Sequence, residues 1–86
     1  MKTSIDISYY PLEETYKVPI KAFIKRLRTH EHILVRTNGM STQVFGEYDD
    51  VMGAITKEIK VSFEVPHSIF ILKVINSDLQ EIPNLG

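Results

Sequence analysis

The stretch V-R-T-N-G-M-S-T-Q-V-F-G-E-Y-D-D, from Val35 to Asp50, decides how this chain folds. Apolar and polar residues alternate on both sides of Asn38-Gly39, with the period of two that is typical of strands. Asn-Gly between two such runs is a strong β-hairpin signal, because both central residues of a type I′ turn need positive φ. The stretch therefore predicts two antiparallel strands, a tight turn at residues 38–39, and then a helix that Asp49 or Asp50 caps.

The residues before the hairpin predict one strand and one helix. Residues 5–10 alternate apolar and polar side chains, which indicates a half-buried strand that ends at Pro11. Pro19 suits the first turn of a helix, where its missing N–H has little effect. The apolar residues that follow recur at helical spacing. They are Ile20, Phe23, Ile24 and Leu27, and Tyr16 extends the same face backwards.

The residues after the hairpin predict a second helix and a last strand, S-I-F-I-L-K-V-I at residues 68–75. The order strand, helix, strand, strand, helix, strand is the split βαβ pattern. We therefore expect an α+β, ferredoxin-like βαββαβ fold: a four-stranded antiparallel sheet with two helices on one face. Residues 1–76 should form this domain and residues 77–86 a C-terminal tail. The second helix has the apolar face Val51, Met52, Ile55, Ile59 and Phe63.

The last strand is apolar on both sides. One set of its residues can face the helices: Phe70, Leu72 and Val74. The other set then faces the opposite side of the sheet: Ile69, Ile71 and Ile75. A strand that is apolar on both sides usually has both sides covered. We therefore expect a homo-oligomer, a dimer or a tetramer, that packs through its sheet faces.

Composition and charge argue against several classes of function. The chain has no cysteine, which excludes disulfides, thiol nucleophiles and thiolate metal sites. Its net charge of −1 gives no electrostatic case for nucleic acid or an anionic membrane surface. No apolar run approaches the ~20 residues of a membrane span, and Asp6 comes too early for a signal peptide. We therefore expect a cytoplasmic protein. We also expect no metal site, since His30 and His32 lack a third ligand.

Short polar side chains gather along the hairpin, a mixture that suits a small, flat, polar ligand. Threonine also fits any strand and asparagine any turn, so the same residues are compatible with a purely structural role. Aromatic rings could stack on such a ligand. We expect Phe23 to belong to the core, and Tyr9, Tyr10 or Phe45 to contact the ligand. No Ser–His–Asp arrangement or carboxylate pair is evident, so we expect a binding protein and not an enzyme. The candidate ligand-binding residues are Tyr9, Thr37, Asn38, Met40, Ser41, Thr42, Phe45 and Glu47.

A stripe of basic residues follows the polar side of the first predicted helix. It consists of Lys17, Lys21, Lys25 and Arg28, with Arg26 nearby. The stripe is compatible with phosphate binding, but a solvated helix face is the more ordinary interpretation. The hairpin itself carries a single cation, Arg36, which favours an unphosphorylated ligand over a pyrophosphate.

Three segments resemble the thiamine/hydroxymethylpyrimidine-binding family of the YkoF type, which includes single-domain thiamine-binding proteins. They are I-S-Y-Y-P-L, V-P-I-K-A-F-I and R-T-N-G-M-S-T-Q-V-F-G-E-Y-D-D-V-M, and the resemblance extends over residues 3–75. It implies a ferredoxin-like fold, self-association through sheets, and a pyrimidine-type ligand near the hairpin. It also implies a non-catalytic protein that binds thiamine or its hydroxymethylpyrimidine moiety in salvage, transport or buffering, with no cofactor beyond that ligand.

The chemistry of the hairpin agrees with such a ligand. An aminopyrimidine presents a ring nitrogen acceptor beside an amine donor, which Asn38, Ser41, Thr42 or the backbone of Met40 can match. A thiazolium cation would favour aromatic rings and Glu47. The alternative is a regulatory or structural oligomerisation module resembling the amino-acid-sensing ACT domains.

Overall fold

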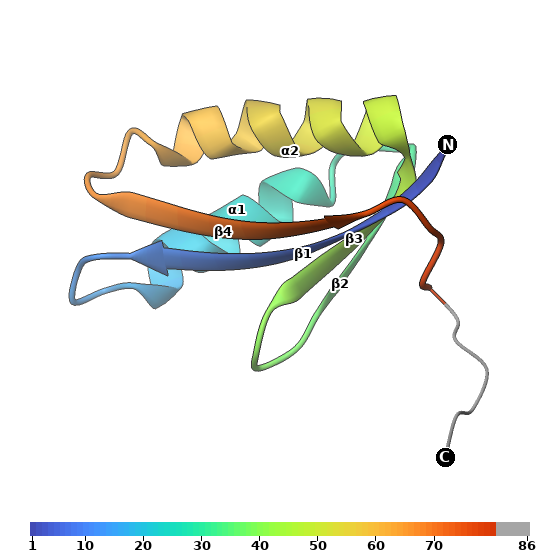
Figure 1. Ribbon diagram of the computed structural model, residues 1–86. Coiled ribbons are helices and arrows are strands. Elements are labelled where there is room, and N and C mark those ends of the chain that lie inside the picture. The colour runs from blue at the N-terminus through green and yellow to red at the C-terminus, as the bar shows by residue number, and fades with distance from the viewer. Residues whose placement is uncertain (81–86) are drawn as a thin grey trace, which may run out of the picture.

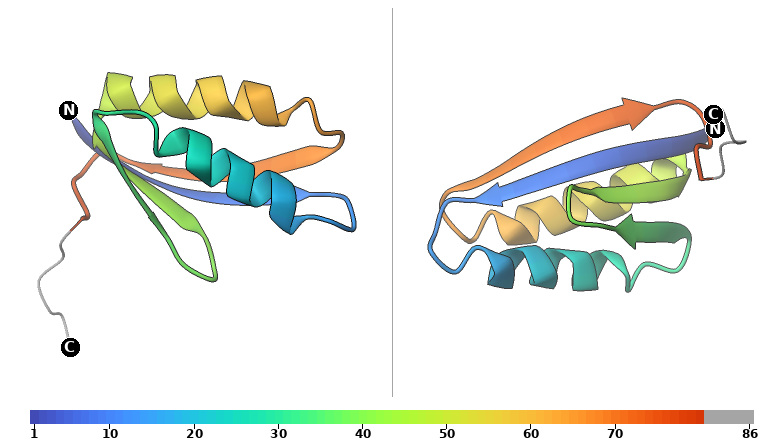
Figure 2. Two further views of the ribbon diagram at one scale, coloured as in Figure 1. Left: turned by 180° about the vertical axis from the view of Figure 1, so that it is seen from behind. Right: turned by 90° about the horizontal axis from the view of Figure 1, so that it is seen from below.

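The computed structural model describes residues 1–80 and has the predicted order of elements (Figure 1). The strands are β1 (Lys2–Pro11), β2 (Ile33–Thr37), β3 (Thr42–Glu47) and β4 (Ser68–Ile75), and the helices are α1 (Lys17–Leu27) and α2 (Tyr48–Ser62). The sheet has the order β2-β3-β1-β4, and all three neighbouring pairs are antiparallel. Both helices lie on one face of the sheet (Figures 1 and 2). The predicted ferredoxin-like α+β fold is confirmed.

The core lies between the helices and the central strand β1. Ile5 and Ile7 alternate with polar residues along β1 and are fully buried. Phe23 of α1 and Val51 and Ile55 of α2 pack into the same cluster. Each of these side chains lies at the spacing that its element requires to reach a single face. The expectation that Phe23 belongs to the core is confirmed.

An aromatic cluster fills the end of the core under α1. The ring of Tyr9 stacks on that of Phe70, with centroids 4.1 Å apart, and meets the edge of Phe23 at 5.6 Å. Phe63 contacts Phe70 from outside at 5.8 Å but is more than half exposed. Tyr16 is about half exposed as well. The predicted apolar faces of the two helices therefore extended too far: Tyr16 is the N-cap residue of α1 and Phe63 the C-cap residue of α2.

The turn between β2 and β3 differs from the prediction. Neither Asn38 nor Gly39 has a positive φ, so the connection is not a type I′ turn. A four-residue loop, residues 38–41, joins the paired residues Thr37 and Thr42. The side-chain oxygen of Asn38 accepts hydrogen bonds from the backbone nitrogens of Met40 (2.8 Å) and residue 41 (3.2 Å). This side-chain-to-backbone bonding closes the loop and replaces the left-handed backbone that was expected.

Helix α2 starts directly where β3 ends, at Tyr48, so the strand is shorter than predicted and neither aspartate is the cap. The N-cap residue is Glu47, which makes no side-chain capping bond, while Asp49 and Asp50 lie in the first turn. There they interact favourably with the helix dipole. Gly46 makes the abrupt change of direction possible. Its φ is 157°, and a Cβ atom there would lie 3.0 Å from the carbonyl oxygen of His32.

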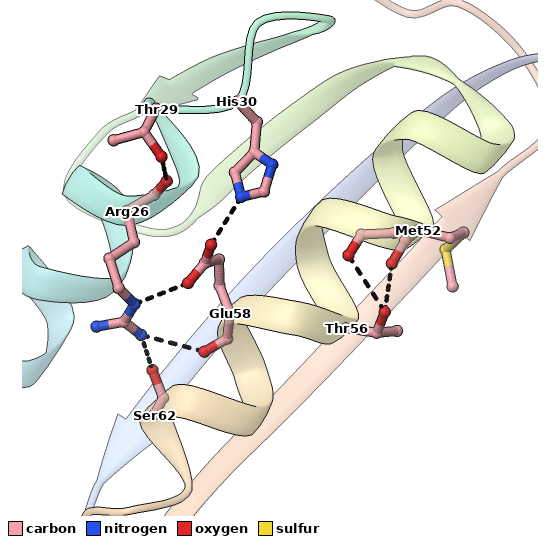
Figure 3. A network of polar contacts seen from close by, with 8 residues as sticks. Arg26, Thr29, His30, Met52, Thr56, Glu58 and Ser62 are labelled. Atoms are coloured by element: carbon pink, nitrogen blue, oxygen red, sulfur yellow. Dashed lines mark hydrogen bonds and ion pairs between the residues drawn. The ribbon is translucent and has the colours of Figure 1, made fainter.

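An ion-pair network joins the two helices (Figure 3). Arg26 of α1 donates to the Glu58 carboxylate (2.9 Å) and to the Ser62 hydroxyl (2.6 Å), and His30 Nε2 lies 2.7 Å from the other Glu58 oxygen. The Glu58 side chain is only 6% exposed. Burial by itself raises the pKa of this carboxyl, but the hydrogen bonds and charges of His30 and Arg26 outweigh it and leave the pKa below its ordinary value.

The segment after β4 covers part of the open face of the sheet. The Ser4 hydroxyl donates to the carbonyl oxygen of Ser77 (2.7 Å) and accepts from the backbone nitrogen of Leu79 (2.9 Å). Arg36 donates to the carbonyl oxygen of Gln80 (2.8 Å). These contacts involve the first part of the predicted tail, and residues 81–86 lie outside the described part of the chain.

Candidate functional site

A cavity of about 140 Å³ lies between α1, the end of β1 and the loop of the hairpin. Its apolar wall consists of the α1 side chains Ile20, Phe23 and Ile24 together with the ring of Tyr9. Its polar wall consists of hairpin residues: Thr37, Asn38, Gly39, Met40, Ser41 and Thr42. An apolar slot with polar groups along one edge is the usual form of a small-molecule site.

The structure brings six of the eight predicted site residues to this cavity. They are Tyr9, Thr37, Asn38, Met40, Ser41 and Thr42. Residues from β1 and from the hairpin meet here because β3 pairs with β1, with Thr42 opposite Ile7. Tyr9 follows two positions later on the same face of β1 and also contributes to the core.

The other two predicted residues, Phe45 and Glu47, lie away from the cavity. Phe45 is on the opposite face of the sheet, where it is 6% exposed and the Arg36 guanidinium lies 5.7 Å from its ring. Glu47 is at the far end of β3, opposite Lys2, and its carboxylate binds the Met1 amino group at 2.8 Å. The hydrogen bond from that amino group lowers the pKa of Glu47. The strand alternation explains Phe45, since its side chain must point away from that of Thr42 three positions earlier.

Two threonine hydroxyls form the centre of the polar wall. The hydroxyl oxygens of Thr37 and Thr42 lie 3.0 Å apart and share one hydrogen bond. A hydroxyl has one donor and two acceptor positions, so this pair retains capacity for a ligand. Thr42 is 6% exposed, and its side chain is therefore held in place by its surroundings. Within residues 1–80, the side-chain nitrogen of Asn38 has no hydrogen-bond partner, whereas its oxygen is used by the loop.

The hydroxyl of Ser41 is used elsewhere. It donates to the Asp6 carboxylate at 2.5 Å and accepts from the Gln43 amide at 2.8 Å. Gln43 also donates to Asp6 at 3.2 Å. Asp6 and Gln43 are paired across β1 and β3 on the face opposite the cavity. Ser41 therefore lines the cavity without offering a free hydroxyl, and Asp6 is the partner that the sequence did not reveal.

A wider groove of about 490 Å³ adjoins the cavity. Residues of the connection between β1 and α1 form its outer part: Leu12, Glu13 and Tyr16. The residues that it shares with the cavity are Tyr9, Tyr10, Ile20, Gly39 and Met40. Leu12, Glu13 and Tyr16 were not proposed for the site, whereas Tyr10 was among the aromatic residues expected to contact a ligand. The spacing of the α1 residues predicted their shared face, but no sequence signal indicated that the hairpin loop would lie beside it.

Two other kinds of feature concern residues 1–80, a cluster of metal ligands and a membrane-spanning helix. No group of three or more histidine or acidic side chains there is arranged to hold a metal ion. His30, considered above as a weak metal candidate, is paired with Glu58. None of the helices in the described part combines the length and the apolar character needed to cross a membrane.

Comparisons with known proteins give matches among solved structures. No protein-family model and no curated protein matches the chain. Protein SP2199 from Streptococcus pneumoniae is similar to it with a TM-score of 0.82 and 22% identity over 95% of this chain and 93% of the other. A Thermotoga maritima protein, TM0486, described as a "putative thiamine biosynthesis/salvage protein", has a TM-score of 0.79 and 15% identity over 90% and 85%.

A third similar structure is a domain of unknown function, DUF77, from Bacillus cereus. Its TM-score is 0.75, with 13% identity over 91% of this chain and 78% of the other. At these identities, the comparisons show a shared fold over nearly the whole chain. They carry no residue role to this protein, so the site rests on its own geometry.

Proposed function

We propose that this protein binds a small aminopyrimidine, thiamine or its hydroxymethylpyrimidine moiety, in the cavity beside the hairpin. The observation that carries the proposal is the composition of the cavity wall. Tyr9 and Phe23 provide aromatic surface for a flat ring, and the Thr37–Thr42 hydroxyl pair provides hydrogen-bonding groups at one edge. The similar fold of the Thermotoga maritima protein supports the same class of ligand.

The cavity alone suits a single ring, and the adjoining groove suits a second one. Ligand sites for molecules of drug size commonly have volumes of roughly 300–1,000 Å³, and the groove has about 490 Å³. Its lining includes Tyr16 and Glu13, which carry an aromatic ring and a carboxylate. Aromatic faces and a carboxylate are favourable surroundings for a cation such as a thiazolium. Glu13 thus takes the role that the sequence suggested for Glu47.

The proposed role is binding without catalysis, in salvage, transport or buffering inside the cytoplasm. We further propose self-association through the open face of the sheet. Ile69 and Ile71 of β4 and Tyr10 of β1 lie on that face, and each is between 45% and 59% exposed. A second copy of the chain would remove this apolar surface from water.

An NMR titration of the ¹⁵N-labelled protein with hydroxymethylpyrimidine tests the proposal. We expect saturable shifts of the backbone amides of Thr37, Thr42 and the cavity-facing turn of α1. The amides of β4 provide an internal control, because that strand does not line the cavity. Shifts confined to β4, or no saturable shift at millimolar ligand, would contradict the proposal.

A further inference from the structure

Two lysines of α1 and the arginine at its C-cap line a groove of about 330 Å³ beside the hairpin. They are Lys21, Lys25 and Arg28, and the other lining residues are Ile24 and Thr37. Spacings of four and three residues place these cations on the same side of the helix. The groove has no acidic residue in its lining. It is therefore a concave surface of one charge sign on a protein whose overall net charge is −1.

The three cations have no counter-charge in the described structure. Within residues 1–80, none of them takes part in an ion pair, whereas Arg26 of the same helix is bound to Glu58. Like charges four residues apart on a helix are slightly destabilising. An anion seated between them would relieve this repulsion and would gain charge-assisted hydrogen bonds.

The basic groove is a neighbour of the cavity. Ile24 and Thr37 line both, so the two spaces meet at these side chains. The wider groove with Glu13 shares neither residue with the basic groove and opens at the other side of the cavity. A ring in the cavity thus has a cation-binding space on one side and an anion-binding space on the other. Arg36, the hairpin's own cation, is not involved, because it lies on the opposite face with Phe45.

We propose that the groove formed by Lys21, Lys25 and Arg28 is a phosphate-binding site, and that it takes the phosphate of a phosphorylated hydroxymethylpyrimidine whose ring occupies the cavity. The position of the ring in the cavity rests on the function proposed above. The phosphate site rests on the three cations alone. A monoester at the hydroxymethyl group places the phosphate one short arm from the ring. The phosphate of a thiamine ester is carried by the second ring instead, and that ring has its own groove.

Calorimetric titrations of hydroxymethylpyrimidine and its monophosphate into the wild type and two variants test this assignment. Lys25→Gln and Arg28→Gln each remove one exposed charge and should weaken the binding of the monophosphate about threefold to fivefold. Binding of the unphosphorylated pyrimidine should be unchanged. Lys57→Gln is the matched control, since Lys57 is an exposed lysine of α2 that does not line the groove. The preference for the monophosphate should also decrease with added salt.

Inorganic pyrophosphate is a probe that does not need the ring. In thermal denaturation, it should raise the Tm of the wild type and of Lys57→Gln more than that of the Lys25→Gln Arg28→Gln double variant. If neither pyrimidine binds but this difference persists, the phosphate site is supported and the pyrimidine assignment falls. A monophosphate that binds no tighter than the alcohol, or equally well to all variants, would overturn the phosphate site.

Discussion

The hydroxyl of Thr42 is the single group on which the proposed recognition depends most. Thr42→Val keeps the shape of the side chain and removes only the hydroxyl. If that hydroxyl bonds the ligand, its loss should weaken binding by about 1–2 kcal/mol, or roughly fivefold to thirtyfold. Thr56→Val is a matched control, because the Thr56 hydroxyl bonds the carbonyl of Met52 on the outside of α2. Equal affinity of the two variants in a calorimetric titration would remove Thr42 from the site.

Two glycines, one in the hairpin loop and one at the strand-to-helix junction, have different surroundings. At Gly46, a Cβ atom would meet a carbonyl oxygen at 3.0 Å and Val51 at 3.1 Å, and φ is 157°. Gly46→Ala should therefore lower the free energy of unfolding by about 1–3 kcal/mol. At Gly39, no atom lies within 4 Å of such a Cβ and φ is not positive. Gly39→Ala should change stability by less than about 1 kcal/mol. Chemical denaturation that ranks the two variants in the opposite order would contradict the backbone conformations described for the loop and the junction.

The sequence indicated which hairpin residues lie together at the cavity better than how their side chains are bonded. The alternation along β3 was readable, and it places Thr42 and Phe45 on opposite faces. A single site that includes both Thr42 and Phe45 is therefore inconsistent with this alternation. The Ser41–Asp6 hydrogen bond could not be predicted, because it depends on the register between β1 and β3 and on a loop two residues longer than a type I′ turn. The Asn-Gly pair predicted positive φ angles. Instead, the side chain of Asn38 closes the loop by a hydrogen bond to the backbone, which needs no positive φ.

At the scale of the elements, Glu58 links α2 to α1 through an ion pair with Arg26. Its carboxylate is buried and accepts from Arg26 and His30. Glu58→Gln removes the negative charge that faces Arg26 and His30. We therefore expect the free energy of unfolding to decrease by roughly 1–3 kcal/mol. Urea denaturation at neutral pH measures the effect. An unchanged midpoint would show that this network does not stabilise the helix pair.

The same network gives stability a defined dependence on pH. The folded-state pKa of Glu58 is below its ordinary value of 4.5. A carboxyl with a lowered folded pKa contributes stability above its unfolded pKa and loses it as the pH falls through the folded pKa. The difference in stability between wild type and Glu58→Gln should therefore be fully present at pH 6 and should shrink below about pH 4.5. A difference that grows on acidification would contradict the sign of this shift.

The elements themselves were predictable, because their apolar spacing alone defines two helices and the strands. The boundaries at α2 were not. No loop separates β3 from α2, so the strand spacing changes to the helix spacing directly between Glu47 and Tyr48. No side-chain capping bond marks this boundary. The polar residues Glu58 and Ser62 lie on the buried side of α2, in positions where the spacing rule expects apolar residues. Arg26 explains both, but its position across the helix pair is a tertiary property.

At the scale of the whole molecule, the open face of the sheet is divided. One part is covered by residues 76–80, and the other part, along β4, exposes Ile69 and Ile71. Ile71→Lys should lower the oligomeric state while leaving the fold intact, because Ile71 is 59% exposed and does not belong to the core. Light scattering of the variant and the wild type measures this, with Lys57→Gln of α2 as a control away from the open face. A wild type that remains monomeric at high micromolar concentration would contradict the proposed self-association.

The central claim is that the cavity beside the hairpin binds an aminopyrimidine, and calorimetric titration of the wild-type protein with hydroxymethylpyrimidine and with thiamine tests it most directly. We expect saturable binding of both with one site per chain. The two ligands should also compete, because both place the same ring against Thr37 and Thr42. Absence of saturable heat with either ligand, together with no shift in Tm, would contradict the claim.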